Sequence, residues 1–557
     1  MSAVAVTVFA GGTVRPGAGL APSTALAVRG DRVVALDDAA LALRTAPGAE
    51  VVDLAGDALL PAFGDGHVHA LFAGLERLGP RVSGLRSVEA VVAEVARWAA
   101  AHADADWVVG GRYDPVLAPG GDLDARLLDA AVPDRPVVLD ATDHHTMWVN
   151  SEALRRCGID AATPEPAGGR IVRRADGSPL GTLREWDACD LVRAHLPART
   201  DAERVAAVAE ATATLAASGV TWLQEAWVEL DTVPAWLEAA RQDRLAARVD
   251  LAIRLDPDRW REQLPLVRDA AADVARLAHP RLTARTVKVF VDGVLEGGTA
   301  TLLEPYLPLP GDRAACACPH PGRGPAVRPA EGWGLPVWSG PELRAALAAY
   351  AAAGFRPHLH VIGDAAVRLG LDALESLRPR GPLPARRAVL AHVQLVDPAD
   401  LPRLAALGVV ANCEPLWAAW DPVQRDLTAP RLGPVRTARQ YPLASLVRSG
   451  AHVSFGSDWP VTSHVPLEGI QVAVTRRPVD EPARAPFVPA ERLDVATALD
   501  AYSRGSAYQA FADDRGVLRP GAEADLVRLS ADPHAVDARD LHAVEVRGTW
   551  CAGARTA

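Results

Sequence analysis

Histidine and aspartate residues stand at the ends of four apolar runs that are spread along the 557-residue chain. In order, these residues are His67 and His69, His358 and His360, His392, and Asp458. Residues two apart on a strand face the same side, so each His-x-His pair can present two ring nitrogens to one ion. One pair alone is weak evidence, because 15 histidines in 557 residues yield roughly 0.4 such pairs by chance. Four such run ends together predict a divalent cation site.

Lys288 interrupts the apolar run 286–291 and is the only lysine among the 58 basic residues of the chain. A charged amine is costly to desolvate at such a position, so burial favours the neutral amine. A neutral amine can add CO₂ to give a carbamate, whose two oxygens can bridge two metal ions. Arginine cannot do this, because its guanidinium stays charged. We therefore expect a CO₂-derived carbamate on Lys288, with a buried ion pair or an amine that reaches solvent as the alternatives.

Short apolar runs alternate with Ala- and Leu-rich helical patterns through the middle of the chain. The predicted strands cover 222–225, 248–253, 286–291, 357–361, 388–393, 409–413 and 452–455, and the helical patterns include 341–353, 364–377 and 398–406. This alternation predicts parallel strands, in either a closed barrel or a doubly wound sheet. In a parallel barrel the C-terminal strand ends open on one face, where catalytic groups lie. The histidines, Asp458 and Lys288 would then converge there.

Both ends of the chain contain short predicted strands with glycine-rich turns. These strands cover 4–9, 25–28, 32–36, 51–54, 525–529 and 543–547. They predict one β-domain built from both termini. Segments near 105–200 and 293–338 interrupt the strand and helix rhythm and are interpreted as insertions, the second as a loop over the site. We expect a β-sandwich part at 1–60, a barrel at 61–505 and a second sandwich part at 506–557.

The composition excludes several classes of partner. The net charge of −11 argues against a broad nucleic-acid or anionic-membrane surface, and no apolar stretch is long enough to span a bilayer. The N-terminus lacks the basic region of a signal peptide, and the six cysteines contain no C-x-x-C pair. We expect a cytoplasmic protein with reduced thiols and a small-molecule partner, with a homodimer left open as its assembly.

Eight segments match, in order, the motifs of a known family. They are 61–69, 145–154, 181–185, 287–293 with 299–300, 360–364, 391–396, 456–461 and 520–526. Together they resemble the amidohydrolase superfamily, specifically its amidohydrolase-3 branch of YtcJ-like metal-dependent hydrolases. The resemblance covers nearly the whole chain. It departs from the family's usual residues at His144, Glu225 and Gly298, which affects contacts with the substrate more than the metal site.

The resemblance implies a distorted (β/α)8 TIM barrel with a small β-sandwich domain built from both chain ends. It also implies metal ligands: His67, His69 and Asp458 around one ion, His360 and His392 around a second, and carboxylated Lys288 as the bridge. His358 is then a neighbour of the site. The metal is expected to be Zn²⁺, in one or two copies, with Mn²⁺ or Fe²⁺ as alternatives.

The expected reaction is hydrolysis of a non-peptide carbon–nitrogen bond, in a linear amide such as an N-acyl or N-formyl compound. Asp458 would act as general base and then general acid, and His145 would assist at the carbonyl oxygen or bind the substrate. Two alternatives stay open. The same site can act on an ester or phosphoester or in an isomerisation, or the chain can be a metal-free binding protein.

Overall fold

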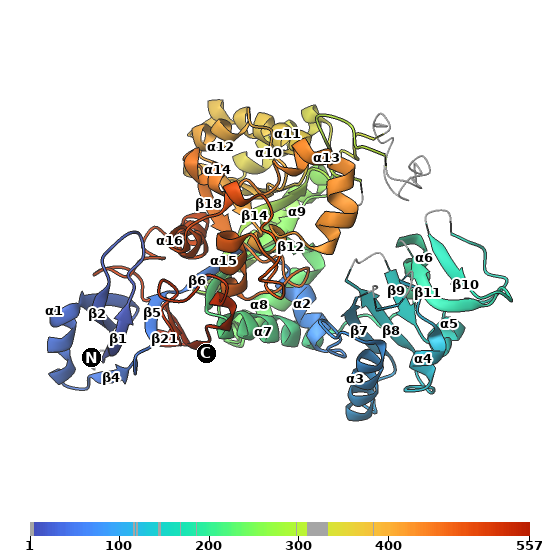
Figure 1. The fold of residues 1–557 in the computed structure, drawn as a ribbon, viewed down its shortest axis with the longest axis horizontal. Helices are drawn as coiled ribbons and strands as arrows, with labels where there is room; N and C mark the ends of the chain where they lie inside the picture. The colour runs from blue at the N-terminus through green and yellow to red at the C-terminus, as the bar shows by residue number, and fades with distance from the viewer. Residues whose placement is uncertain are drawn as a thin grey trace. The chain divides into compact units, whose positions relative to one another are not determined.

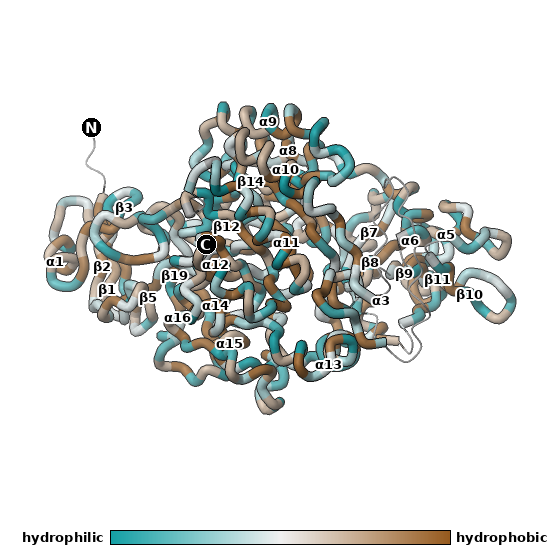
Figure 2. The backbone as a smooth tube through the Cα atoms, turned by 90° about the horizontal axis from the view of Figure 1, so that it is seen from above, coloured by the Kyte–Doolittle hydropathy of each residue, from teal (hydrophilic) through white to brown (hydrophobic). Residues whose placement is uncertain are grey.

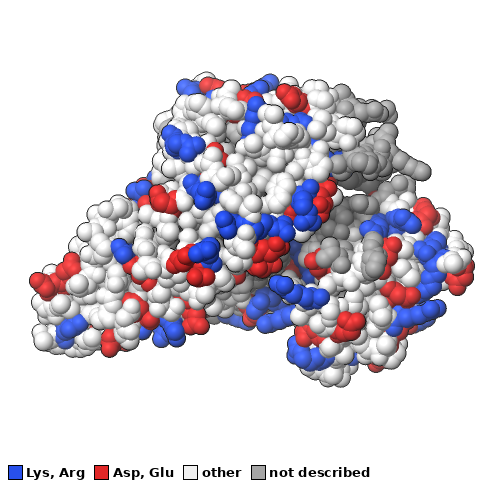
Figure 3. All heavy atoms as spheres, viewed as in Figure 1, with Lys and Arg blue, Asp and Glu red and all other residues white. Residues whose placement is uncertain are grey.

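A computed structural model describes residues 5–114, 117–118, 121–142, 146–166, 169–184, 186–296, 298–308, 332–382 and 384–557. The chain divides into two compact units, which Figure 1 shows by colour along the sequence. One unit is formed by Leu71–Ala211, and the other contains both chain ends and a large parallel sheet. Basic and acidic side chains are interspersed over the face shown in Figure 3. None of the described helices combines the length and the apolar character that a membrane-spanning segment needs.

Eight parallel strands form the barrel that the sequence predicts. Their order is β18-β17-β16-β15-β14-β13-β12-β6. Their bounds are β6 Phe63–Val68, β12 Val220–Val228, β13 Arg248–Arg254, β14 Leu282–Phe290, β15 Arg356–Val361, β16 Val389–His392, β17 Val410–Cys413 and β18 His452–Phe455. All consecutive neighbours pair in parallel, and these strands are almost entirely buried, as expected of a sheet covered by helices. The predicted fold class is confirmed.

Helices connect the barrel strands and surround the sheet (Figure 1). They are α7 Asp201–Ala217, α8 Val233–Arg241, α9 Trp260–Leu277, α10 Gly340–Ala352, α11 Asp364–Glu375, α12 Leu401–Leu407, α13 Ala429–Thr437, α14 Leu443–Arg448, α15 Pro466–Thr475, α16 Val495–Asp500 and α17 Ser506–Gln509. The predicted helical patterns 341–353, 364–377 and 398–406 correspond to α10, α11 and α12. The Ser339 side chain caps α10 by accepting a hydrogen bond from the Glu342 N–H.

Backbone hydrogen bonds close the barrel between β6 and the segment that follows β18. The Asp458 N–H donates to the His67 carbonyl over 2.8 Å, and the His69 N–H donates to the Trp459 carbonyl over 2.8 Å. Two candidate metal residues of the sequence, His67 and Asp458, are therefore joined by their backbones where the first and the last barrel strand meet.

A second sheet combines both ends of the chain. Its strands are β1 Val6–Val14, β2 Ser23–Arg29, β3 Arg32–Leu36, β4 Glu50–Asp53, β5 Ala58–Pro61, β19 Leu526–Leu529, β20 Val546–Cys551 and β21 Ala554–Arg555, in the order β21-β20-β19-β5-β1-β2-β3 with β4 beside β1. The mainly apolar strands β1 and β2 lie side by side in Figure 2. Antiparallel pairing of β5 with β19 joins the two ends, with Leu60 opposite Val527.

The last strands of this sheet differ from the sequence prediction. The sequence predicts a strand at 543–547, but Leu541–Ala543 forms a 3₁₀ turn and β20 begins at Val546. The position of β20 is set by tertiary contacts: Trp550 pairs with Leu526, and its ring packs edge-on against Phe9 with centroids 5.1 Å apart.

The unit Leu71–Ala211 has a five-stranded sheet of its own, and the predicted insertion near 105–200 falls within it. The sheet order is β10-β11-β9-β8-β7, with β7 Val108–Tyr113, β8 Val137–Ala141, β9 Thr146–Val149, β10 Arg170–Arg173 and β11 Pro179–Arg184. The helices are α2 Ala70–Arg77, which begins at the unit boundary, α3 Val88–Ala101, α4 Ala125–Asp129, α5 Ser151–Arg156 and α6 Trp186–Arg193. Asn150 caps α5 through the Ala153 N–H and also bonds the backbone at Val132, Arg135 and Val137.

The start of the predicted loop 293–338 is fixed next to β14 and β15. The carboxylate of Asp292 accepts hydrogen bonds from the backbone N–H groups of Thr301, Ile362 and Gly363. Leu295, Ala300, Leu302, Ile362, Leu395 and Leu432 form a small apolar core there. The sequence predicts that the loop 293–338 covers the site, but its residues 309–331 lie outside the described part of the chain.

Candidate metal centre

The barrel brings the six predicted metal residues to the C-terminal ends of its strands. Lys288 comes from β14, His360 from β15 and His392 from β16, whereas the other three, His67, His69 and Asp458, lie where β6 meets the segment after β18. All six are largely removed from solvent; the His67 and Lys288 side chains are fully buried, and His69, the most exposed of the six, has 12% of its side chain accessible. The second catalytic candidate, His145, lies outside the described residues.

Three residues form one cluster of ligand atoms. The Oδ1 atom of Asp458 lies 2.9 Å from His69 Nε2 and 3.5 Å from His67 Nε2. Their ligand atoms all lie within 4.8 Å of one another, which suits one divalent ion. Lys288 Nζ lies 3.3 Å from the same His67 Nε2, so the amine borders this cluster.

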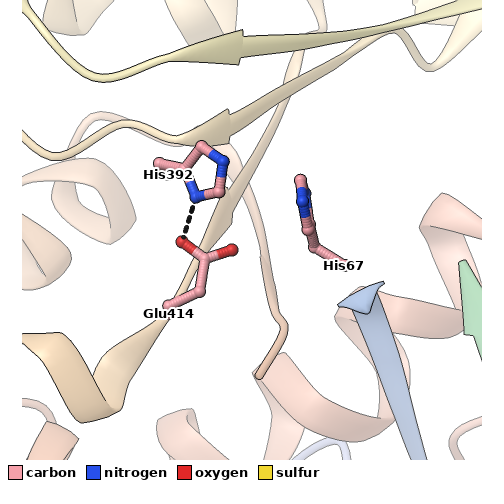
Figure 4. Close-up of side chains that lie close together, drawn as sticks. All are labelled: His67, His392 and Glu414. Carbon is pink, nitrogen blue, oxygen red and sulfur yellow. Dashed lines mark hydrogen bonds and ion pairs between the residues drawn. The ribbon is translucent and has the colours of Figure 1, made fainter. Parts of the chain in front are cut away.

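A second cluster consists of His67, His392 and Glu414, whose ligand atoms also lie within 4.8 Å of one another. His392 Nδ1 lies 2.9 Å from Glu414 Oε2, and the other oxygen of Glu414 points to the side on which His67 lies (Figure 4). Sequence reasoning missed Glu414. The only sequence signal for Glu414 was its position directly after the strand β17, which is weak for a glutamate.

His360 lies beside this second cluster. Its ring centroid is 4.5 Å from that of His392, and its Nε2 atom contacts the Gly293 carbonyl at 3.1 Å. Neither three-residue cluster found among the described residues includes His360. His358, expected as a neighbour, contacts His67: its Nε2 atom lies 2.9 Å from His67 Nδ1.

Burial shifts three histidines and Lys288 of the site toward their neutral forms. Burial and nearby positive charge hold the pKa values of His67, His358 and His360 well below the ordinary value of imidazole. Burial also lowers the pKa of Lys288 to about 7, although Asp458 and Glu414 oppose this shift. Neutral imidazole is the form that binds metals, and a neutral amine is the form that reacts with CO₂.

Asp458 is the exception, because it is favoured as an anion. Burial alone would raise its pKa, but His69, His392 and Lys288 together hold the pKa below the ordinary value of aspartate. The site therefore combines a carboxylate with several neutral nitrogen ligands, which is a donor set that Zn²⁺ prefers.

Two motifs of the sequence have a structural role beside the ligands. The Asp65 carboxylate accepts hydrogen bonds from the hydroxyl and the backbone N–H of Ser457, at 2.5 and 3.0 Å. It thereby ties β6 to the segment that carries Asp458. Gly456 allows the close approach of the two segments, since a Cβ there would lie 2.7 Å from the backbone nitrogen of His67.

Aromatic side chains border the cluster. Trp417 stacks on His392 with ring centroids 5.2 Å apart and planes 6° from parallel. Trp227 contacts both Phe290 and His69, with centroids 4.9 and 6.2 Å away. The surroundings of the metal residues are therefore apolar as well as buried.

The residues present fit a divalent cation. The Oε1 atom of Glu414 is buried and accepts no hydrogen bond within the part of the chain that the structure describes. A buried carboxylate oxygen without a donor is unfavourable unless a cation faces it. Two buried carboxylates, Asp458 and Glu414, next to neutral imidazoles supply the charge that such an ion requires.

Comparisons with known proteins agree with this arrangement. A model of the Amidohydrolase family matches residues 50–557. The protein YtcJ of Bacillus subtilis (strain 168) is 30% identical over 512 residues, which are 90% of this chain and 89% of YtcJ. N-substituted formamide deformylase of Arthrobacter pascens is 25% identical over 521 residues, 91% of this chain and 90% of that protein.

A solved structure has the same fold along nearly the whole chain. The crystal structure of an uncharacterized metal-dependent hydrolase from Pyrococcus furiosus aligns with a TM-score of 0.72 at 24% identity, covering 95% of this chain and all of that one. The resemblance inferred from the motifs is thus confirmed: the chain has the fold of this solved structure, and it belongs to the amidohydrolase family.

Proposed function

We propose that this protein hydrolyses a non-peptide carbon–nitrogen bond in a small linear amide, such as an N-acyl or N-formyl amine, at a Zn²⁺ site. The observation that carries the proposal is the cluster of His67, His69 and Asp458, with Asp458 Oδ1 2.9 and 3.5 Å from the two ring nitrogens. The choice of bond is supported by the relative from Arthrobacter pascens, whose name describes the deformylation of N-substituted formamides.

The ligands divide between two positions. His67, His69 and Asp458 would hold one ion. His360 and His392, whose ring centroids are 4.5 Å apart, would hold a second, with Glu414 beside His392. Zn²⁺ bound here would polarise the substrate carbonyl and lower the pKa of a coordinated water toward ~7. The remaining chemistry belongs to the side chains of the chain.

Asp458 is suited to move the proton. Its carboxylate would accept a proton from the attacking water and deliver it to the nitrogen of the leaving amine, so that the acyl–nitrogen bond breaks as the amine becomes neutral. The contact with His69 keeps the carboxylate oriented between these steps. The bordering rings of Trp227 and Trp417 would exclude bulk water from the reacting carbonyl.

Lys288 would bridge the two positions as a carbamate. The neutral amine attacks CO₂, a nitrogen–carbon bond forms, and one proton leaves to solvent. Full burial and the 3.3 Å approach to His67 place the amine beside the ligand atoms of the first cluster. An arginine at this position would keep the positive charge and could not form the carbamate.

The expected partner of the protein is a small molecule. A net charge of −11 and the interspersed charges of Figure 3 favour a small molecule over nucleic acid. The described cysteines are unpaired thiols, in keeping with action in the cytoplasm. Assembly as a homodimer stays a prediction.

Metal content and CO₂ dependence test the proposal. Wild-type protein is loaded with Zn²⁺, Mn²⁺ or Fe²⁺ in the presence and absence of bicarbonate and compared with Lys288→Arg. We expect wild type to bind stoichiometric metal and to hydrolyse members of a library of N-acyl and N-formyl amines faster than the matched esters. Lys288→Arg cannot form the carbamate and is therefore expected to lose bound metal and activity.

Each outcome separates a different part of the proposal. Full metal occupancy and full activity of Lys288→Arg would refute the carbamate. Faster turnover of esters than of amides would refute the choice of bond, and wild type without stoichiometric metal would refute a metal-dependent reaction. Asp458→Asn, which removes the proton carrier, should abolish turnover while the fold is retained.

A further inference from the structure

A polar cavity lies at the opposite end of the barrel from the metal residues. Its volume is about 280 Å³. It is lined by the first residues of β13, β14 and β15, by Trp222 near the start of β12, and by the segment 510–512 with Arg515. Because these strands are parallel, their amino ends are remote from the strand ends that carry Lys288 and His360. The cavity is therefore separate from the proposed active site.

Arginine dominates this cavity. The lining includes Arg248, Arg281, Arg285, Arg356 and Arg515, with Asp250 as its only acidic residue among those described. Five guanidinium groups at one small cavity are unexpected in a chain whose net charge is −11. The positive charge is thus a local feature.

Three of the five arginines are balanced by carboxylates. Arg356 pairs with Asp250 at 3.1 Å. Arg248 pairs with Asp525 and Glu523, and Arg515 pairs with Glu523. Three carboxylates therefore offset three guanidinium groups, and the pairs hold the cavity wall in place.

The other two arginines carry charge that the protein does not neutralise. The Arg281 guanidinium donates a hydrogen bond to the Leu245 carbonyl, at 2.6 Å. Arg285 contributes its backbone N–H to Asp250, and its side chain is exposed. Neither side chain forms an ion pair with any residue in the described part of the chain. Two positive charges remain at the cavity, and a bound anion would compensate them.

The pKa of Arg356 reflects the excess of positive charge at the cavity. Arg356 is 4% exposed, and burial together with the positive charges of Arg285 and Arg387 lowers its pKa. Its guanidinium is held by the side chains of Gln224 and Thr286, at 2.7 and 2.8 Å. This network keeps a charged group fixed at the cavity although like charges face it, which is the arrangement that an anion stabilises.

We propose that this cavity is a binding site for a small phosphate-type oxyanion. Guanidinium groups bind tetrahedral oxyanions through paired N–H donors, and lysine, the usual alternative, is absent from this part of the chain. The volume is below the range of about 300–1,000 Å³ that drug-sized ligands occupy, so the site suits an inorganic anion or a single phosphate group.

The site is linked to the metal centre through one strand. Arg356 and His358 are two residues apart on β15, so both side chains face the same side of the sheet. His358 contacts His67 at 2.9 Å. An oxyanion that fixes the start of β15 would therefore stiffen the strand that carries His358 and His360.

Titration with inorganic phosphate tests the proposal. Binding to the purified, metal-loaded protein is measured by calorimetry and by the shift of the unfolding temperature, at constant ionic strength set with sodium chloride. The variant is the double substitution Arg281→Gln and Arg285→Gln; the matched control is Arg268→Gln with Arg344→Gln, which removes the same charge from exposed positions on α9 and α10. We expect the cavity variant to bind phosphate at least tenfold more weakly and the control variant to bind like wild type.

Two results would overturn the proposal. One is that the wild type shows no phosphate effect beyond that of chloride. The other is that binding persists unchanged in the cavity variant, which would place the phosphate at the metal centre instead. Both substituted side chains reach solvent, so we expect the cavity variant to unfold like wild type in the absence of phosphate, which verifies that it is folded. Arg285→Lys keeps the positive charge and should keep part of the affinity for phosphate.

Discussion

The Nδ1 atom of His392 lies 2.9 Å from Oε2 of Glu414, and both side chains are buried. Trp417 also restricts the His392 ring, because its indole stacks on the face of the same imidazole. The short segment after β17 thus holds His392 by an edge and by a face. Carboxylate partners of metal-binding histidines fix the ring and raise its basicity.

Glu414→Ala should weaken metal binding at the His392 position by about 10- to 100-fold, the usual effect of removing such a partner. Competition with a chelator, read as the affinity of each bound ion, measures this. Glu414→Gln keeps an acceptor without the charge and should fall between wild type and alanine. Equal metal affinities of wild type and Glu414→Ala would show that the carboxylate has no part in the site.

Gly456→Ala should disturb the metal site through the backbone. A Cβ at this position would lie 2.7 Å from the His67 backbone nitrogen, so β6 and the segment before Asp458 would have to separate. We expect a loss of stability of about 1–3 kcal/mol, as for other overpacked sites, and reduced metal content. Gly340→Ala is the control, because there the nearest atoms are flexible side-chain ends at 3.3 and 3.5 Å. A Gly456→Ala protein with wild-type unfolding temperature and metal content would contradict the argument.

Asn150→Ala should destabilise the unit Leu71–Ala211. The side chain accepts from the N–H groups of Val137 and Ala153 and donates to the carbonyls of Val132 and Arg135. Loss of four buried hydrogen bonds at about 1 kcal/mol each predicts a cost of about 4 kcal/mol. Asn150→Asp keeps both acceptor contacts but turns a carboxylate oxygen toward the carbonyls of Val132 and Arg135, so its unfolding temperature should fall at least as far as that of Asn150→Ala. A wild-type unfolding temperature of Asn150→Ala would mean that these four hydrogen bonds contribute nothing.

The stability of the same unit should depend on pH through Glu76. Burial raises the pKa of Glu76 to about 7, although Arg112 opposes this shift. The folded state therefore binds the proton more tightly than the unfolded state, whose pKa is near 4.5. Stability from this group is fully present below about pH 4.5 and declines by up to about 3 kcal/mol as pH rises to 7.

Glu76→Gln tests this pH dependence because glutamine cannot titrate. As the pH rises from 5 to 8, the unfolding temperature of wild type should decrease relative to that of the variant. A difference that grows over this range would mean that the ion pair with Arg112 outweighs burial.

The sequence predicted candidate site residues where a residue type that can bind a metal stands in or at the end of a predicted strand. His67, His69, Lys288, His392 and Asp458 became candidates because each interrupts or ends an apolar run, and parallel pairing then brings such residues to one face. The barrel followed from the same alternation.

Glu414 was missed for a reason of residue type. Glutamate is common at exposed loop positions, so its place after β17 does not stand out without the three-dimensional contact with His392. The start of β20 was also misplaced, because its position depends on packing of Trp550 against Phe9 from the other end of the chain. Local propensity does not contain such partners.

The pairing of β5 with β19 has a consequence for biosynthesis. Leu60 and Val527 are opposite each other in the finished sheet, yet nearly the whole chain separates them. At ~5–20 residues per second, a ribosome needs tens of seconds to bridge this gap. During that time the apolar strands β1, β2 and β5 leave the exit tunnel without their neighbour, so the nascent chain exposes an open sheet edge until its last strands appear. We expect this interval to be the period in which the protein depends most on chaperones.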